Sequence, residues 1–359
     1  MNNNQHNSRA LNEYFAQEHG FSLLEMVIAA TVFLIIMGTI FGLLRAGDQM
    51  KQVVNDRSDV VANARAVVDF MGRDVINAGS GYSKSGAVVP DDFLYDLIKI
   101  PADGDNLRDI IPAVVAGNDI STSVLSKPGE KNDLIFLTFR DLTFNNGEPV
   151  KFLDIHTVSS TPVMKTAPGG CANCKLWDVY LFESPTGKQA LGIVTSANAD
   201  SISLAQNNPL NMNRKIVGNV DTRSILTKCA VGELTNCFDY SPQVTAKRVF
   251  LISYSVNNKG TLIQTRYGNN SSGNATQQID KKELAYGVEK FQVRYLMEDG
   301  SLVDDPSNGF TEPFNMNNVI QVEMRITVKS ESPTNGKVKV EYINLNSTFS
   351  TRNLGYTSE

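Results

Sequence analysis

A carboxylate inside an apolar stretch is the residue best placed to do chemistry in this sequence. Glu25 is the only charged residue in the run FSLLEMVIAATVFLIIMGTIFGLL, which extends from Phe21 to Leu44. A carboxylate within a membrane helix costs about 2.5–3.5 kcal/mol, and such residues are usually functional. If the chain is cut between Gly20 and Phe21, the new α-amino group lies close in sequence and can neutralise Glu25, on the same chain or on a neighbour. Gly20 also suits a peptidase that needs a small residue before the scissile bond.

The four cysteines lie far downstream of this run, at Cys171, Cys174, Cys229 and Cys237. An even number of cysteines in a polar region favours structural disulfides in an oxidising compartment. We expect the local pairs Cys171–Cys174 and Cys229–Cys237, although four cysteines allow three connectivities. A zinc site is disfavoured because the spacing is not that of a zinc ribbon. A redox dithiol is disfavoured because the C-x-x-C lacks a βαβ context.

Other residues that could bind metals or catalyse reactions are few. Asp299, Asp304 and Asp305 cluster near Gly300 and could bind calcium, but without an EF-hand pattern solvated turn carboxylates are the preferred interpretation. Of three histidines, only His156 lies beyond the first twenty residues. No nucleotide loop, G-x-S-x-G elbow or H-E-x-x-H motif is present. The sequence therefore predicts no cofactor, no metal and no enzymatic activity.

Length and charge narrow the classes of protein further. The chain has 359 residues, which suggests one or two domains. Its formal net charge is -5, from 33 basic and 38 acidic residues. Such a balance excludes general nucleic-acid binding by the chain as a whole.

The element that must hold Glu25 is the apolar run itself. As a helix it would span about 36 Å, enough to cross a hydrocarbon core of roughly 30 Å. A cleaved secretory signal has a shorter apolar core and a small-residue cleavage site after it, whereas here Arg45, Ala46 and Gly47 follow. An uncleaved anchor with an accidental glutamate remains an alternative. Gly38 and Gly42 form a G-x-x-x-G spacing, which permits close helix packing or reflects membrane-helix composition.

An amphipathic pattern continues beyond Leu44. Apolar residues recur every three or four positions and predict a single stripe that packs on a globular head: Met50, Val53, Val54, Val60, Val61, Ala64, Val67, Val68, Met71 and Val75. The helix is expected to end at Ala78, because Gly79 permits a left-handed cap. From Phe21 to Ala78 it would be roughly 87 Å long.

The remainder of the chain predicts a β-rich head. Residues 79–130 are rich in Gly, Pro, Asp and Ser and are expected to be mainly connecting loops with short elements. Seven β-branched and aromatic runs predict strands: Leu134–Arg140, Leu176–Phe182, Val249–Tyr254, Thr261–Tyr267, Phe291–Met297, Val319–Val328 and Lys337–Asn344. Residues 298–301 suit a hairpin turn. The expected fold class is α+β, with a long N-terminal helix packed on an antiparallel head.

The hexapeptide from Gly20 to Glu25, placed at the start of the apolar run, resembles the cleavage and methylation motif of type IV prepilins. Type IV pilins and type II secretion pseudopilins carry this motif. The resemblance implies cleavage after Gly20 by a prepilin peptidase, N-methylation of Phe21, and pairing of Glu25 with the amino terminus of an adjacent subunit. The long helix, the size of the head and the closing V-x-M-R-I-T-V strand look most like minor pilins of the PilW type. Secretion pseudopilins of the J type are similar.

This resemblance implies an organisation and a role. The expected segments are a leader (1–20), a transmembrane and assembly half of the helix (21–44), an amphipathic half (45–78), a connecting region (79–131) and a head (132–359). The expected partners are a prepilin peptidase, other major and minor pilin subunits, and inner-membrane lipid before assembly. The N-terminus would be cytoplasmic and the head periplasmic, before display in a pilus at the cell surface. Alternatives are a secretion pseudopilin and a tip-located adhesin.

Overall fold

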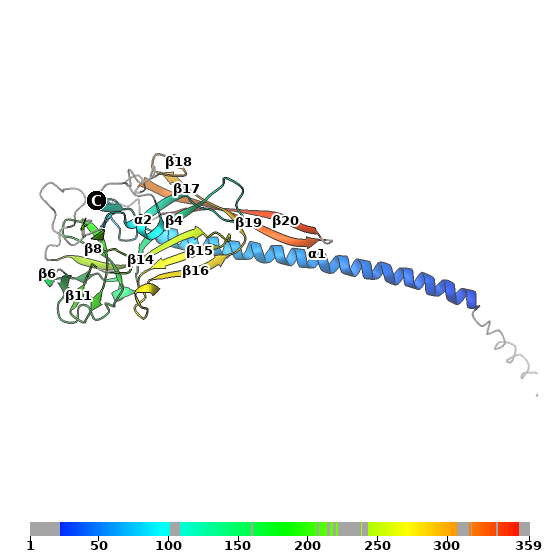
Figure 1. Ribbon diagram of the computed structural model, residues 1–359, viewed down its shortest axis with the longest axis horizontal. Helices are drawn as coiled ribbons and strands as arrows, with labels where there is room; N and C mark the ends of the chain where they lie inside the picture. Colours follow the sequence, from blue (N-terminus) through cyan, green and yellow to red (C-terminus); the bar gives the residue numbers. More distant parts are fainter. Residues whose placement is uncertain are drawn as a thin grey trace, which may run out of the picture. The chain divides into compact units, whose positions relative to one another are not determined.

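A computed structural model describes most of the chain (Figure 1). The described residues are 22–100, 108–158, 161–206, 208–213, 216–217, 220–221, 238, 243–306, 316, 318–334 and 337–351. They fall into two compact units, one within residues 1–58 and 332–338 and the other within residues 59–331 and 339–359. The predicted α+β class is confirmed, since a long apolar helix is followed by a β-rich head.

The first element, α1 (Leu23–Asn77), is a single helix of 55 residues (Figure 1). It contains no proline, and its first half is rich in Leu, Met and Ala, which lose little or no side-chain freedom in a helix. Gly79 follows its end with a φ of 79° and donates its N–H to the carbonyl oxygen of Thr138. The helix therefore ends one residue before the expected Ala78, at the predicted glycine stop.

The larger sheet of the head has ten strands. Seven follow one path: β16 (Ile279–Ala285), β15 (Leu262–Tyr267), β14 (Thr245–Val256), β8 (Val179–Glu183), β9 (Gln189–Ile193), β1 (Ala87–Val89) and β2 (Asp109–Ile111). β4 (Asn132–Arg140) and β5 (Val150–Lys151) also pair with β14, and β3 (Val114–Ser121) pairs with β4. Pairing is antiparallel except between β1 and β9, which run parallel.

Three further sheets complete the described strands. A four-stranded sheet has the order β18 (Leu302–Val303), β17 (Val288–Met297), β19 (Val319–Thr334) and β20 (Lys337–Ser350). A second has the order β10 (Ser196–Ala197), β11 (Ser201–Ser203), β7 (Thr161–Lys165) and β6 (Asp154–Val158). The last joins β12 (Ile216–Val217) to β13 (Val220–Asp221). Short helical elements are α2 (Phe93–Ile98), Phe144–Gly147 and Ala275–Gln277.

Each of the seven predicted runs contains a strand, with different bounds in several cases. β14 and β20 are longer than expected, whereas β8 begins only at Val179. The run before it is interrupted at Trp177, whose φ of 68° is incompatible with a strand. The predicted turn after β17 is present, with Gly300 at a φ of 83° and the N–H of Met297 donating to the carbonyl oxygen of Ser301.

Residues 79–131 contribute more to the sheet than the sequence suggested. They contain β1, β2 and β3, which belong to the ten-stranded sheet, as well as α2. β1 has only three residues, all buried, and β3 pairs with β4 along its first half. Runs this short, set among Gly, Pro and Asp, lack the alternation that identifies a strand from sequence. Their pairing depends on neighbours that are distant in the chain.

The main core includes the second half of α1. Ala64, Val67, Val68, Met71 and Val75 are buried among strands of the head. Each fully buried Val or Met contributes about 1.5–3 kcal/mol. The predicted stripe is thus confirmed from Val60 onward and corrected before it, because Met50 and Val54 remain 73% and 60% exposed. Only the second half of the helix belongs to the same compact unit as the head strands.

Candidate functional site

The first turn of α1 brings Glu25 and Ser22 together. The backbone N–H of Ser22 donates to Oε2 of Glu25 over 3.1 Å, and the hydroxyl of Ser22 accepts from the N–H of Leu24 over 3.1 Å. The first N–H groups of a helix have no partner within the helix, so this arrangement satisfies two of them. It closely resembles a capping box, in which a Ser is followed three residues later by Glu. The carboxylate of Glu25 is therefore a local cap and is still solvent-exposed.

The apolar half of α1 is exposed along its whole length. Leu23, Phe33, Ile36 and Leu44 are 83%, 57%, 50% and 60% exposed. Within the described part of the chain, α1 is the helix long and apolar enough to cross a membrane by length and composition, with a mean hydropathy of 2.6 over an 18-residue window. So large an apolar surface is unfavourable in water. It requires lipid or other apolar helices around it.

Gly38 and Gly42 lie within this exposed stretch. A Cβ atom added at either position would meet nothing within 4 Å. Neither glycine is therefore required by contacts within this chain. The G-x-x-x-G spacing remains available for close approach by a second helix, and the packing role stays a prediction.

The second half of α1 is attached to the head by a buried polar contact. The hydroxyl of Tyr254 on β14 donates to Oδ2 of Asp74 over 2.6 Å, and the Gln264 amide donates to the Tyr254 hydroxyl over 2.9 Å. Burial raises the pKa of Asp74, while its hydrogen bonds and the nearby charge of Arg266 act in the opposite direction. An unpaired carboxylate here would be costly, so this network fixes the rotation of α1 against β14 and β15.

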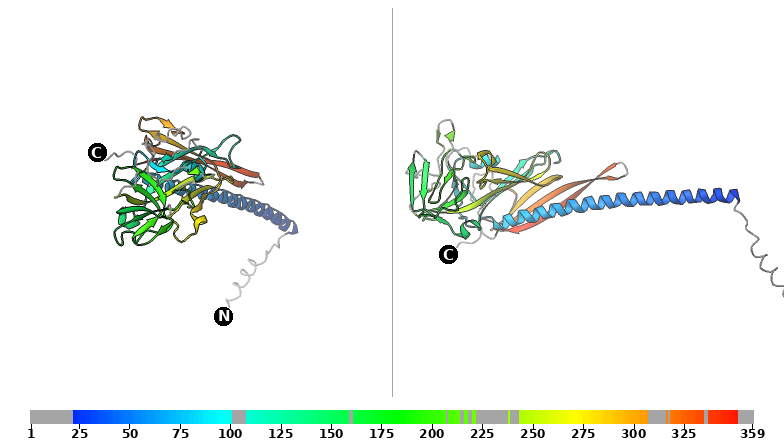
Figure 2. Two further views of the ribbon diagram at one scale, coloured as in Figure 1. Left: turned by 60° about the vertical axis from the view of Figure 1, so that its left-hand side comes forward. Right: turned by 90° about the horizontal axis from the view of Figure 1, so that it is seen from below.

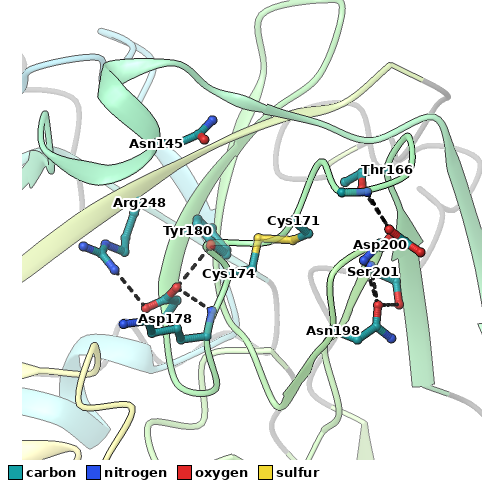
Figure 3. The surroundings of a disulfide bond; sticks show 12 residues. Asn145, Thr166, Cys171, Cys174, Asp178, Tyr180, Asn198, Asp200, Ser201 and Arg248 are labelled. Atoms are coloured by element: carbon teal, nitrogen blue, oxygen red, sulfur yellow. Dashed lines mark hydrogen bonds and ion pairs between the residues drawn. A yellow bond between two sulfur atoms is a disulfide. The ribbon is translucent and has the colours of Figure 1, made fainter.

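The predicted Cys171–Cys174 disulfide is present in the structure (Figure 3). Both cysteines are buried in a second hydrophobic cluster with Phe152, Tyr180 and Phe182. The backbone N–H of Cys171 donates to the carbonyl oxygen of Ala199, which anchors the disulfide loop on the turn between β10 and β11. The buried disulfide therefore has a structural role. The predicted Cys229–Cys237 pair lies outside the described residues.

Beside the disulfide, Arg248 joins two parts of the head. Its guanidinium group lies 2.6 Å from Oδ2 of Asp141. It also lies 3.4 Å from Oδ1 of Asp178 (Figure 3). Burial alone would raise the pKa of Asp141, but hydrogen bonds from Thr143 and Arg248 hold that pKa below its ordinary value. At Asp178 burial prevails and the pKa is raised. Along β14, pairing with β8 ends at Arg248 and pairing with β4 begins at Val249, so Arg248 stabilises this junction.

The aspartates considered for calcium are engaged elsewhere. Asp304 accepts from Nε of Arg294 over 2.8 Å, and Asp299 accepts from the N–H and hydroxyl of Ser301. No group of three His, Cys, Asp or Glu side chains among the described residues is arranged to hold a metal ion. His156, partly exposed on β6, lies 3.1 Å from Asp154. Asp299 is thus a turn carboxylate, whereas Asp304 forms an ion pair with Arg294 of β17. The expectation that no metal binds here stays a prediction.

Comparison with known families identifies the N-terminal region. Residues 16–41 match the prokaryotic N-terminal methylation motif. The match supports a type IV pilin-like protein. The motif implies processing by a prepilin peptidase and assembly with other pilins, and the apolar helix suggests the membrane anchoring typical of pilins. No curated protein matches the chain.

The matched residues contain every predicted processing and assembly position of this pilin-like chain. Gly20 and Phe21 fall within the match but outside the described residues, whereas Glu25 is described. The capping role of Glu25 was not predicted, although the S-x-x-E pattern from Ser22 to Glu25 was available as a signal. The role of Arg248 was not predicted either, because its partners are distant in the chain and leave no local signal.

Proposed function

We propose that this chain is a minor pilin that is cleaved after Gly20, N-methylated at Phe21 and incorporated into a type IV pilus-like filament. Residues 1–20 act as the leader, 21–44 as the transmembrane and assembly segment, 45–78 as the amphipathic half of the helix, and 79–131 and 132–359 as the connecting region and head. The N-terminus starts in the cytoplasm and the head in the periplasm. The role is structural, in priming or capping the filament, and not enzymatic.

The observation that carries this proposal is the placement of the methylation motif on an exposed apolar helix. The motif covers residues 16–41, and the apolar side chains of α1 from Leu23 to Leu44 are uncovered in the single chain. The same helix continues until its second half enters the core of the head. A helix with this division suits a subunit that is first held in lipid and later bundled with the helices of its neighbours.

The physical chemistry of assembly follows from that division. Apolar helices leave lipid at little cost when they bury the same surface against one another. A charged carboxylate at Glu25 is unfavourable in this environment without a counter-charge. After cleavage, the α-amino group of Phe21 on an adjacent subunit supplies that charge. The pair then selects one axial register among the many that apolar packing alone would permit.

Mass spectrometry of the N-terminus tests the proposal most directly. The full chain is purified from cells with and without the prepilin peptidase, and from sheared filaments. We expect an N-terminus at methylated Phe21 in filaments and an intact Met1 when the peptidase is absent. An N-terminus at Met1 in assembled material would refute the proposal. The subunits that copurify with the chain distinguish a pilus from a type II secretion pseudopilus.

A further inference from the structure

The outer edge of β20 is a long strand edge without a neighbour among the described residues. β20 is the last strand of its sheet and borders only β19 there. Two contacts define how it pairs. The N–H of Thr351 donates to the carbonyl oxygen of Ile320 over 3.1 Å, and the hydroxyl of Thr327 donates to Oδ1 of Asn344 over 2.8 Å. Together they set one antiparallel register in which Thr327 faces Asn344.

The register shows which backbone N–H and C=O groups of β20 do not face β19. In an antiparallel pair, successive residues alternate between pointing their N–H and C=O groups toward the partner strand and away from it. The N–H of Thr351 points toward β19, so the N–H and C=O groups of Phe349 and Ser347 also point toward β19. Asn344 and Thr348 are of the opposite parity, so their N–H and C=O groups point away from the sheet. This edge can accept the backbone of an added strand.

The side chains of β20 also do not protect its edge against pairing with another chain. Proteins usually guard exposed edges with charges, prolines, bulges or very short strands. β16, the edge of the ten-stranded sheet, has such guards, because it carries Asp280, Lys281, Lys282 and Glu283 and is paired to β15 through a bulge. From Tyr342 to Ser350, β20 reads YINLNSTFS, with no charge, proline or glycine. A neutral β-forming edge of this kind favours pairing with another chain.

β20 is held against the helix that carries the assembly motif. Leu345 and Phe349 pack against the main core, and Gly72 of α1 lies so close to the ring of Phe349 that a Cβ there would overlap it. Figures 1 and 2 show the second half of α1 and β20 side by side. The opposite face of β20 is open, with Tyr342 52% exposed. A subunit that packs beside this part of α1 therefore also meets β20.

We propose that the outer edge of β20, from Tyr342 to Ser350, accepts an extended segment of another pilin-like subunit by strand addition. This inference rests on the proposed function, because the added segment belongs to another subunit of the proposed filament. Main-chain hydrogen bonds to Asn344, Asn346 and Thr348 hold the added segment. A second copy of this chain is the less suitable occupant. Antiparallel pairing of two β20 strands has twofold symmetry, which turns the second halves of the two α1 helices in opposite directions. Subunits anchored in one membrane share one direction.

Site-specific photo-crosslinking in the full chain, in cells that assemble the filament, tests the inference. One photoreactive residue is placed at Thr348 on the open edge, one at Lys281 on the guarded edge of β16, and one at Ile36 on the apolar helix. We expect crosslinks to another pilin-like subunit from Thr348 and Ile36 but not from Lys281. Crosslinks from Ile36 without any from Thr348 overturn the strand addition and leave the proposed function standing. Their absence at both positions overturns both.

A backbone substitution separates strand addition from a side-chain contact. Asn344→Pro removes an N–H that points away from β19, which an edge strand tolerates. Asn344→Val, like Asn344→Pro, removes the side-chain hydrogen bond with Thr327, but it keeps the backbone N–H of residue 344. The proline variant should lower the Thr348 crosslink roughly tenfold, the factor expected for a lost backbone hydrogen bond, and the valine variant should leave it near the wild-type level. Equal crosslinking in the two variants, or a Thr348 crosslink to a second copy, would overturn the proposal. Matching thermal unfolding of the two variants controls for folding.

Discussion

Glu25 has a partner within its own chain and a proposed partner on another. In the single subunit its carboxylate accepts the N–H of Ser22 and so caps α1. In the filament we propose that it meets the amino terminus of Phe21 from a neighbour. A carboxylate has two oxygens and several acceptor positions, so the two contacts are compatible. They differ in what they require, since a cap needs only an acceptor oxygen whereas the pairing requires a negative charge.

Substitution of Glu25 by Gln separates these requirements. Gln still serves in a capping box, so Glu25→Gln should insert into the membrane and keep the first turn of α1. It should nevertheless be incorporated into filaments at least about tenfold less, because disruption of a buried ion pair costs about 3–5 kcal/mol and 1.4 kcal/mol corresponds to tenfold. The measurement is the ratio of the variant in sheared filaments to that in the membrane fraction.

The matched variant for this experiment is Glu25→Ala, which removes both the cap and the charge. If Gln and Ala reduce incorporation equally, the charge accounts for the effect. Wild-type incorporation of Glu25→Gln would show that Glu25 acts only as a helix cap. The charge pair would then have no support, while the methylation motif would still indicate processing by a prepilin peptidase.

At the scale of elements, α1 is one helix with two different environments. Its first half is not covered by any other described part of the chain, and its second half is packed in the core. The contrast is clear at two glycines. Gly38 has open space around it, whereas Gly72 lies against the ring of Phe349. Glycine weakens a helix by about 1 kcal/mol relative to alanine, so each of them needs a reason.

These two glycines make a matched pair of substitutions. Gly72→Ala should reduce the free energy of unfolding by about 1–3 kcal/mol, because the new methyl group displaces Phe349 from the core. Gly38→Ala should leave the head unchanged, since its methyl group contacts nothing in the chain. Thermal unfolding of the detergent-solubilised full chain measures both effects. A double variant with Phe349→Leu should recover part of the loss at Gly72, and failure to recover would place the strain elsewhere.

At the scale of the whole molecule, Asp133 links two sheets. Its carboxylate accepts the N–H of Asp119 on β3 over 3.0 Å and the N–H of Val293 on β17 over 2.7 Å. Burial raises the pKa of Asp133 to about 6, with further contributions from the carboxylates of Asp119 and Asp304, and the two N–H donors oppose the shift. The ten-stranded sheet and the sheet that ends in β20 are therefore joined by a group that titrates in a mildly acidic range.

This titration predicts how stability depends on pH. An unfolded Asp has a pKa of about 3.9, so the folded state binds the proton more tightly. The stabilisation is complete below about pH 4 and is lost as pH rises through about 6. The total is on the order of 3 kcal/mol. Since Asp133→Asn cannot titrate, the difference in unfolding free energy between wild type and variant should decrease by that amount from pH 4 to pH 7.

Urea unfolding at several pH values measures this difference. Its advantage is that carboxylates elsewhere in the chain titrate in both proteins and cancel. If the difference stays constant or grows as pH rises, Asp133 is not protonated preferentially in the folded state. The linkage between the sheets would then not depend on pH.

Features that are complete within a short stretch of the chain were predictable from the amino-acid sequence. The apolar run, its single carboxylate, the glycine stop after α1 and the seven strand runs are contiguous patterns, so each is complete within a short window of residues. The methylation motif is of the same kind, because residues 16–41 act through their order along the chain. The local Cys171–Cys174 bridge could also be anticipated, since only three positions separate its cysteines.

Features that depend on partners distant in the chain were not predictable from the sequence. The strands β1, β2 and β3 depend on pairing, since β1 lies between β9 and β2, and β3 pairs with β4. Arg248 and Asp133 were not recognisable from sequence because their partners lie up to 160 residues away. The point at which α1 enters the core, near Val60, is set by the reach of the head strands and not by the stripe on the helix. The physical reason is that burial and pairing are properties of positions in space, which a periodic pattern permits but does not specify.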